Sequence, residues 1–191
     1  MQRVSVVGNS GSGKTTLARQ LAAAMDVPLL ELDSIFHLPG WTDLPAEEFR
    51  DRVGAFVKGG RWVVDGNYSV VRLLVWARAD TVVWVDPPHP VVMARVVRRT
   101  LRRVVTREEL WNGNREPWSN VLSFDPGRSI VAWSWTQRHK YRDRYSSAMT
   151  DPDWAHIEFV PVRTRADRRR LLAAAQAAAS GRPGQLDEQV P

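Results

Sequence analysis

The stretch from Gly8 to Thr15, which reads Gly-Asn-Ser-Gly-Ser-Gly-Lys-Thr, constrains this chain more than any other feature. It fits the pattern of two glycines separated by four residues and followed by Lys and then Ser or Thr. An apolar run, residues 4–7, comes before it, and a helical pattern, residues 16–25, comes after it. A loop between a strand and a helix is the setting that this pattern requires, so the stretch predicts a phosphate-binding loop.

The residue types in this loop suit a phosphate chain. Its glycines let successive N–H groups point at one anion, and the first turn of the next helix adds unpaired N–H groups and a positive dipole end. We expect Lys14 to reach the β- and γ-phosphates of ATP and the Thr15 hydroxyl to bind Mg²⁺. The expected ATP contacts in the loop are Gly8, Ser10, Gly11, Ser12, Gly13, Lys14, Thr15 and Thr16.

Length and composition narrow the class of protein. The 191 residues, 43% of them hydrophobic, allow one domain with a proper core over residues 1–180 and a flexible tail over residues 181–191. The absence of cysteine excludes a disulfide framework and any cysteine chemistry. No apolar run reaches membrane-spanning length, and a strand that starts by Val4 leaves no room for a signal peptide, so we expect a cytoplasmic protein with no membrane partner.

Two carboxylates end apolar runs that are predicted to be strands. Asp33 follows residues 27–32, and Asp65 ends residues 61–65 just before a glycine. Ligands bind at the carboxyl edge of an open α/β sheet, so Asp33 is a candidate to hold an acceptor hydroxyl or the Mg²⁺ shell, and otherwise a cap of the next segment. Asp65 is a candidate to hold Mg²⁺ through water, and otherwise a turn residue.

Several candidates for contact with a second substrate follow these strands. Residues 34–44 lack periodicity and predict a loop over a pocket, where His37 and Trp41 either face the substrate or simply pack. After Asp65, the residues Asn67, Tyr68 and Arg72 lie at the same rim and are expected to contact the acceptor. Between the two sets, residues 45–58 predict a helix.

The arginines of the second half of the chain predict a set of phosphate contacts. Residues 90–103 predict a helix with its apolar stripe at Val91, Ala94, Val97 and Leu101. Residues 104–128 lose periodicity and predict a lid, and residues 129–149 resume a helix. Closure of the lid would bring arginines over the phosphates during transfer. The expected catalytic residues are Lys14, Asp33, Arg95, Arg99 and Arg138.

Strands and helices alternate along the whole chain. Further strands are predicted at residues 80–86 and 155–160, and a last helix at residues 164–180, whose start resembles a capping box and whose arginines predict a solvated face. This alternation predicts an α/β fold with a parallel sheet and helices on both faces.

At this point the chain resembles a small P-loop kinase. It is similar to the adenylate kinase-like group that includes the bacterial topology modulation proteins (FlaR-like). The resemblance covers residues 1–165, and it is carried by the loop, by Leu32-Asp33 with Pro39-Gly40-Trp41, and by residues 61–68 and 79–86. It implies a P-loop NTPase fold with a five-stranded parallel sheet of order 2-3-1-4-5, a lid insertion after the helix that bears Arg95 and Arg99, and an adenine bordered by Arg163 and Thr164.

One departure from the resemblance bears on the acceptor. True adenylate kinases place Phe-Pro-Arg after the Asp-Gly pair, where this chain has Asn67-Tyr68-Ser69. The acceptor therefore need not be a nucleoside monophosphate, and a small hydroxylated molecule fits at least as well. We expect an ATP- and Mg²⁺-dependent phosphotransferase.

The alternative is a nucleotide-gated protein that binds nucleic acid or a protein partner through a basic surface. The formal charge of +6, from 27 Lys and Arg against 21 Asp and Glu, suits phosphorylated small molecules, nucleic acid or mere solubility. Because no stretch reads as a DNA-reading module, nucleic acid is not favoured.

Overall fold

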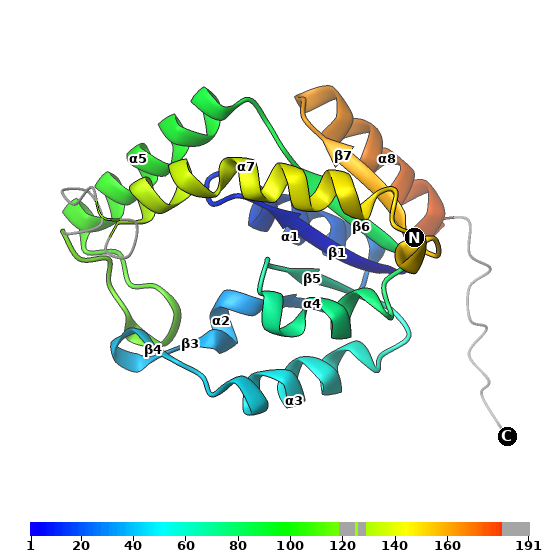
Figure 1. The fold of residues 1–191 in the computed structure, drawn as a ribbon, viewed down its shortest axis with the longest axis horizontal. Coiled ribbons are helices and arrows are strands. Elements are labelled where there is room, and N and C mark those ends of the chain that lie inside the picture. The colour runs from blue at the N-terminus through cyan, green and yellow to red at the C-terminus, as the bar shows by residue number, and fades with distance from the viewer. Residues whose placement is uncertain (119–124, 126–128, 181–191) are drawn as a thin grey trace, which may run out of the picture.

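A five-stranded parallel sheet forms the centre of the fold (Figure 1). The computed structural model describes residues 1–118, 125 and 129–180, without the side chains of residues 137–139. The strands are β1 (Arg3–Gly8), β2 (Leu29–Glu31), β5 (Trp62–Asp65), β6 (Thr81–Val85) and β7 (Glu158–Val162), in the order β2-β5-β1-β6-β7. Numbered along the chain without the two strands of a separate hairpin, this order is 2-3-1-4-5, as expected.

Helices cover both faces of the sheet, which confirms the expected layers (Figure 1). On one face α1 (Lys14–Met25) and α8 (Arg165–Ser180) pack against Val4, Val6 and their neighbours. On the other face lie α3 (Ala46–Val57), α4 (Ser69–Trp76) and α7 (Ile130–Ala148). Because both faces are buried, the strands are almost continuously apolar rather than alternating.

The segment after β2 differs from the expected loop. The chain enters a short helix, α2 (Leu32–Phe36), so Asp33 lies in the first turn of a helix rather than at the end of a strand. Leu32, Ile35 and Phe36 sit at helical spacing and all pack into the core, which explains the change. A hairpin follows, made of β3 (His37–Leu38) and β4 (Thr42–Asp43) joined by a 3-10 turn, Pro39–Trp41.

The helix α5 (His89–Thr106) buries a different stripe from the one expected. Its buried residues are Val92, Val96, Thr100 and Val104, whereas Val97 and Leu101 are exposed. The phosphate-binding loop determines which face of α5 is buried, because α5 packs directly on Gly11. A Cβ at position 11 would collide with Val96 and lie 2.8 Å from the Val92 carbonyl oxygen. The sequence pattern was compatible with both stripes, and this close packing selects the one that was not predicted.

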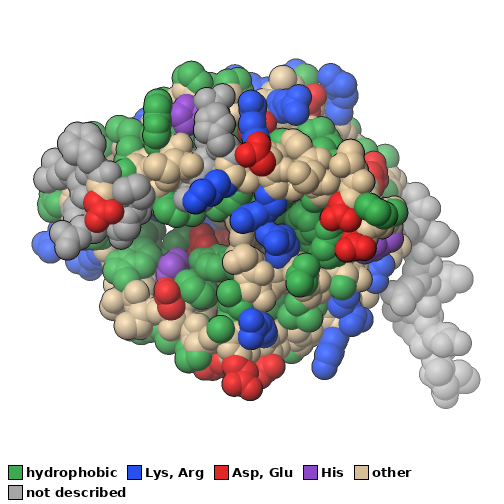
Figure 2. All heavy atoms as spheres, viewed as in Figure 1, with side chains coloured by type: hydrophobic (Ala, Val, Ile, Leu, Met, Phe, Trp, Pro, Cys, Tyr) green, Lys and Arg blue, Asp and Glu red, His purple; other side chains and the backbone are tan. Residues whose placement is uncertain are grey.

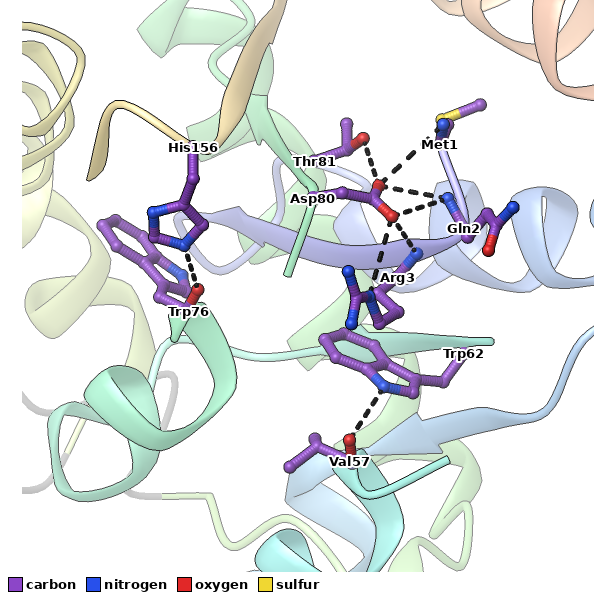
Figure 3. A network of polar contacts seen from close by, with 9 residues as sticks. All are labelled: Met1, Gln2, Arg3, Val57, Trp62, Trp76, Asp80, Thr81 and His156. Atoms are coloured by element: carbon purple, nitrogen blue, oxygen red, sulfur yellow. Dashed lines mark hydrogen bonds and ion pairs between the residues drawn. The ribbon is translucent and has the colours of Figure 1, made fainter. Parts of the chain in front are cut away.

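A polar network ties down the amino-terminal edge of the sheet. Asp80 accepts hydrogen bonds from the backbone N–H groups of Gln2 and Arg3 and from the Thr81 hydroxyl (Figure 3). This network fixes β1 to β6 at the edge opposite the phosphate-binding loop. Within the described ranges, no helix is long and apolar enough to cross a membrane.

Candidate functional site

The predicted phosphate-binding loop joins β1 to α1. Gly11 and Gly13 adopt φ angles of 78° and 95°, in the left-handed region that favours glycine. Gly13 precedes the first residue of α1, Lys14, so the loop backbone runs directly into a helix N-terminus. The Ser12 hydroxyl oxygen is buried and has no hydrogen-bond partner among the described residues. These features fit a site for phosphate groups.

Asn67 holds the start of the loop. Its Oδ1 accepts a hydrogen bond from the Gly8 N–H at 3.0 Å, and its Nδ2 donates to the Gly8 carbonyl oxygen. The Tyr145 hydroxyl donates to the same Oδ1 at 3.0 Å. The amide expected to contact an acceptor is therefore engaged with the loop backbone.

The helix α7 holds the loop from another side. The Asn9 side chain donates to the Ser134 carbonyl oxygen at 2.8 Å, and the Ser134 hydroxyl donates to the Ser10 carbonyl oxygen at 3.3 Å. No local sequence pattern predicts this contact, because its partners stand more than 120 residues apart.

The expected arginine row of α5 points at the loop. Arg95 donates to the Ser12 carbonyl oxygen at 3.1 Å, and Arg99 donates to the Ser10 hydroxyl at 2.9 Å. Burial, and then the nearby Arg103, lower the pKa of Arg99. The side chain of Arg138, the third expected arginine, lies outside the described residues.

Arg168 joins this group, although the sequence predicted a solvated face there. It donates twice to the Gln20 side-chain oxygen, at 3.0 and 2.8 Å, and its pKa is lowered by burial and then by Arg95. The position of Arg168 in the sequence could have indicated this contact. Arg168 lies one turn into the helix that follows the last strand, and that helix starts at the sheet edge that carries the loop.

Asp65 ends β5 beside the loop and is only 4% exposed. Burial raises its pKa, while the Lys14 ammonium and the Thr15 hydroxyl lower it and Asp33 raises it further. Its Oδ1 has no hydrogen-bond partner in the part of the chain that the structure describes. A buried carboxylate with a spare oxygen next to a threonine hydroxyl fits a Mg²⁺ ion bound through water.

Asp33, Tyr68 and His37 form the acceptor side of the candidate site. The Tyr68 hydroxyl donates to Asp33 Oδ1 at 2.7 Å and lies 3.3 Å from His37 Nε2. Burial, followed by the charge of Asp33, raises the pKa of Tyr68, so this phenol stays protonated and acts as a donor. Three of the residues expected to face a second substrate are thus brought together.

Trp41 instead contacts the segment predicted to be a lid. Its indole N–H donates to the Arg115 carbonyl oxygen at 3.0 Å, and its backbone N–H donates to Asn114 Oδ1 at 3.0 Å. Asn112 and Asn114 also donate to carbonyl oxygens of residues 34–38. The described start of that segment therefore lies against the hairpin, while residues 119–124 and 126–128 fall outside the described residues.

Arg163 and Thr164 lie at the carboxyl end of β7. Thr164 and Asp167 cap α8 reciprocally: the Thr164 N–H donates to Asp167 Oδ2 at 2.8 Å, and the Asp167 N–H donates to the Thr164 hydroxyl at 3.1 Å. This confirms the predicted capping box. The Arg163 guanidinium lies 5.9 Å from the ring of Trp84, which is close to the carboxyl end of β6. Arg163 and Thr164 therefore border the same sheet edge as the loop.

A parallel sheet whose central strand runs through a glycine-rich loop into a helix defines the class of P-loop nucleotide-binding proteins. Within that class, the model of the ATPase family associated with various cellular activities (AAA) matches residues 4–106, which are 103 of the 191 residues. The chain belongs to this family.

Kinases are among the similar proteins. Two curated cytidylate kinases of Nitratidesulfovibrio vulgaris, from strains Hildenborough and DP4, are 36% and 35% identical over 75 residues. The match covers 34% of this chain, which spans about a third (32%) of the length of these relatives.

Solved structures share the fold over almost the whole chain. Shikimate kinase from Acinetobacter baumannii, in complex with shikimate, is 17% identical with a TM-score of 0.53 over 96% of each chain. A gluconokinase from Sinorhizobium meliloti is 17% identical with a TM-score of 0.51, over 94% of this chain and 91% of that one. This likeness shows the P-loop kinase fold.

Proposed function

We propose that this protein is an ATP- and Mg²⁺-dependent phosphotransferase that moves the γ-phosphate of ATP to a nucleotide or a small hydroxylated acceptor. One observation carries the proposal: the Tyr68 hydroxyl holds the Asp33 carboxylate at 2.7 Å, while Asn67, the residue before Tyr68, holds the start of the phosphate-binding loop at Gly8. A carboxylate for the acceptor and the loop for the phosphates are thus held from the same strand end. The likeness to cytidylate, shikimate and gluconate kinases supports the reaction class.

The loop backbone and Lys14 bind the ATP phosphates, and Arg163 and Thr164 border the adenine. Thr15 and Asp65 hold Mg²⁺, which when bound neutralises charge on the β- and γ-phosphates. Arg95 and Arg99 stabilise the negative charge that develops during transfer, since a guanidinium fork stays charged and binds two oxygens at once. Thr16 and Ser10 complete the phosphate contacts.

The transfer step follows from these positions. Asp33 accepts the proton of the acceptor hydroxyl while that oxygen forms a bond to the γ-phosphorus. The bond between the γ-phosphorus and the β–γ bridging oxygen breaks, and its electron pair leaves with ADP. Tyr68, whose hydroxyl also contacts His37, orients Asp33. The segment from residue 104 to 118, with Trp41, closes the acceptor side as part of a lid that excludes water.

The narrower kinship with the topology modulation group is part of this proposal. It is supported by residues 61–68, where the structure gives Asp65, Asn67 and Tyr68 separate contacts around one loop. These contacts tie the metal-side carboxylate, the loop and the acceptor side to a single strand end.

The test is a transfer assay with γ-labelled ATP, Mg²⁺ and a panel of nucleoside monophosphates, sugars and hydroxy acids. Wild type is expected to label one class of acceptor, and Asp33→Asn to lower kcat by about 10²-fold while the affinity for ATP is unchanged. Equal turnover by the two proteins would refute the role of Asp33. If no acceptor is labelled and ATP instead tunes a salt-dependent affinity for DNA, the protein is a nucleotide-gated binding protein.

A further inference from the structure

Two arginines next to the acceptor side have no carboxylate partner. Arg72 on α4 and Arg144 on α7 take part in none of the ion pairs among the described residues. The Nη1 atom of Arg72 is buried and makes no hydrogen bond. Arg142, which lies two residues before Arg144 on α7, differs from both because its guanidinium pairs with the Asp86 carboxylate at 3.0 Å. Within the described part of the chain, these two partly buried guanidiniums therefore lack the counter-charge that arginines away from solvent normally have.

Aromatic rings hold the two side chains in place. The Arg72 guanidinium lies 5.9 Å from the Trp76 ring centre, and that of Arg144 lies 5.7 Å from the Tyr141 ring centre. Stacking of this kind fixes a guanidinium without neutralising it. The rings of Trp76 and Tyr145 approach to 6.2 Å, so α4 and α7 are neighbours here, and Figure 2 shows Lys and Arg side chains gathered at the centre of this face.

The two positive charges influence each other. Burial lowers the pKa of Arg72, and the charge of Arg144 lowers it further. Two like charges in a partly desolvated place repel, and a bound anion would remove that repulsion. The surroundings of the pair thus favour an anionic ligand over a neutral one.

Arg72 also adjoins the acceptor side of the candidate site. Arg72 lines a small cavity together with Asn67, Tyr68 and Tyr145. Tyr68 donates to Asp33, and Tyr141, whose ring lies 5.7 Å from the Arg144 guanidinium, stacks on Tyr145, which donates to Asn67. An acceptor whose hydroxyl lies at Asp33 would therefore extend past these tyrosines to the arginines.

We propose that Arg72 and Arg144 form a binding subsite for an anionic oxygen group of the acceptor, a carboxylate or a phosphate that is distinct from the accepting hydroxyl. The inference rests on the proposed function and names its substrate class: hydroxylated carboxylic acids or phosphate monoesters rather than neutral sugars. One guanidinium from each helix binds the group from two sides, as arginine forks do with carboxylates and phosphates.

The experiment measures anion binding without turnover. The loop is saturated with Mg²⁺ and a non-hydrolysable ATP analogue, and inorganic phosphate or acetate is titrated at constant ionic strength while backbone NMR shifts are followed. We expect saturable binding of at least one anion to wild type, and the stronger binder tells phosphate from carboxylate. Arg144→Gln and Arg72→Gln should each weaken it about tenfold, whereas Arg78→Gln, an exposed arginine just after α4, should not.

Several outcomes would overturn the subsite. Wild type could show no saturable binding of phosphate or acetate, or wild type and Arg144→Gln could bind the anion with equal affinity. Arg72 packs on Trp76, so its replacement also tests folding. If Arg72→Gln unfolds, Arg72→Lys is measured as well, because it keeps the charge and loses the planar guanidinium fork. If wild type transfers no phosphate but still binds the anion through the two arginines, only the proposed phosphotransferase activity is refuted. If wild type transfers phosphate and its anion binding does not depend on the arginines, only the subsite is refuted.

Discussion

Single residues in this site act through partners that lie far away in the sequence. Asn67 was expected to contact an acceptor, but its amide pairs with the N–H and the carbonyl oxygen of Gly8, 59 residues earlier. Only an amide offers a donor and an acceptor side by side in this way. Asn67 therefore positions the loop, and its substitution tests that role against the one predicted from the sequence.

The informative change is Asn67→Asp, which keeps the shape and the oxygen that accepts from Gly8. The second oxygen would then face the Gly8 carbonyl oxygen, so the loop should shift and the affinity for the ATP analogue should fall about tenfold, as for the loss of a charged or buried hydrogen bond. Isothermal calorimetry measures this, with Ser69→Ala at a nearby exposed position as control. A change in acceptor KM with unchanged ATP affinity would support the acceptor role instead.

The sequence predicts candidate site residues where their position in a motif identifies them. Lys14, Thr15 and Asp65 are fixed by their positions at strand and helix ends, and the structure brings them together. It did not predict the contact of Trp41 with residues 114 and 115 or that of Arg168 with Gln20. Such contacts depend on how separate elements pack, and no local pattern encodes that.

At the scale of elements, α7 connects the loop, the acceptor side and the core. It contributes Ser134 to the loop, Tyr145 to Asn67 and Arg142 to Asp86. The sequence predicted this helix and the parallel sheet, because strand and helix periods are local. It placed the apolar stripe of α5 wrongly, because the buried face depends on where Gly11 leaves room.

Tyr145, the more buried of the two buried tyrosines in the described part of α7, makes stability depend on pH. Burial, and then Tyr141, raise the pKa of Tyr145 above its ordinary value of about 10. The folded protein then holds this proton where the unfolded chain has lost it, so its stabilising effect is complete below about pH 10 and is lost as the pH rises above that. We expect urea-unfolding free energies to fall with pH between 9 and 11, and Tyr145→Phe to make this fall shallower by up to about 1.4 kcal/mol per pH unit.

The phenylalanine variant also lacks the hydrogen bond to Asn67, so it should be less stable at every pH, and the slope rather than the absolute value is diagnostic. Ser146→Ala, at the neighbouring exposed position, serves as control. Identical slopes for wild type and Tyr145→Phe would show that Tyr145 ionises alike in both states.

At the scale of the whole molecule, the loop couples nucleotide binding to global stability. It is bonded to the segment after β5 through Asn67, to α5 through Arg95 and to α7 through Ser134, so elements from both halves of the chain meet there. A ligand that binds this loop only in the folded state must raise the unfolding temperature of the whole domain.

A Mg²⁺-bound ATP analogue at 100 times its Kd should stabilise wild type by about 2.7 kcal/mol. For a chain of this size, that corresponds to a rise in Tm of about 5–10 °C in differential scanning calorimetry. Lys14→Ala should lower the ligand-free Tm only slightly, since the Lys14 side chain makes no hydrogen bond or ion pair among the described residues and acts on Asp65 only through its charge. The variant should nevertheless lose most of the rise at the same ligand concentration. Lys58→Ala, at an exposed lysine after α3, should behave as wild type. Equal rises in Lys14→Ala and Lys58→Ala would mean that the nucleotide binds elsewhere, and the phosphate-binding loop would then lose its assigned role.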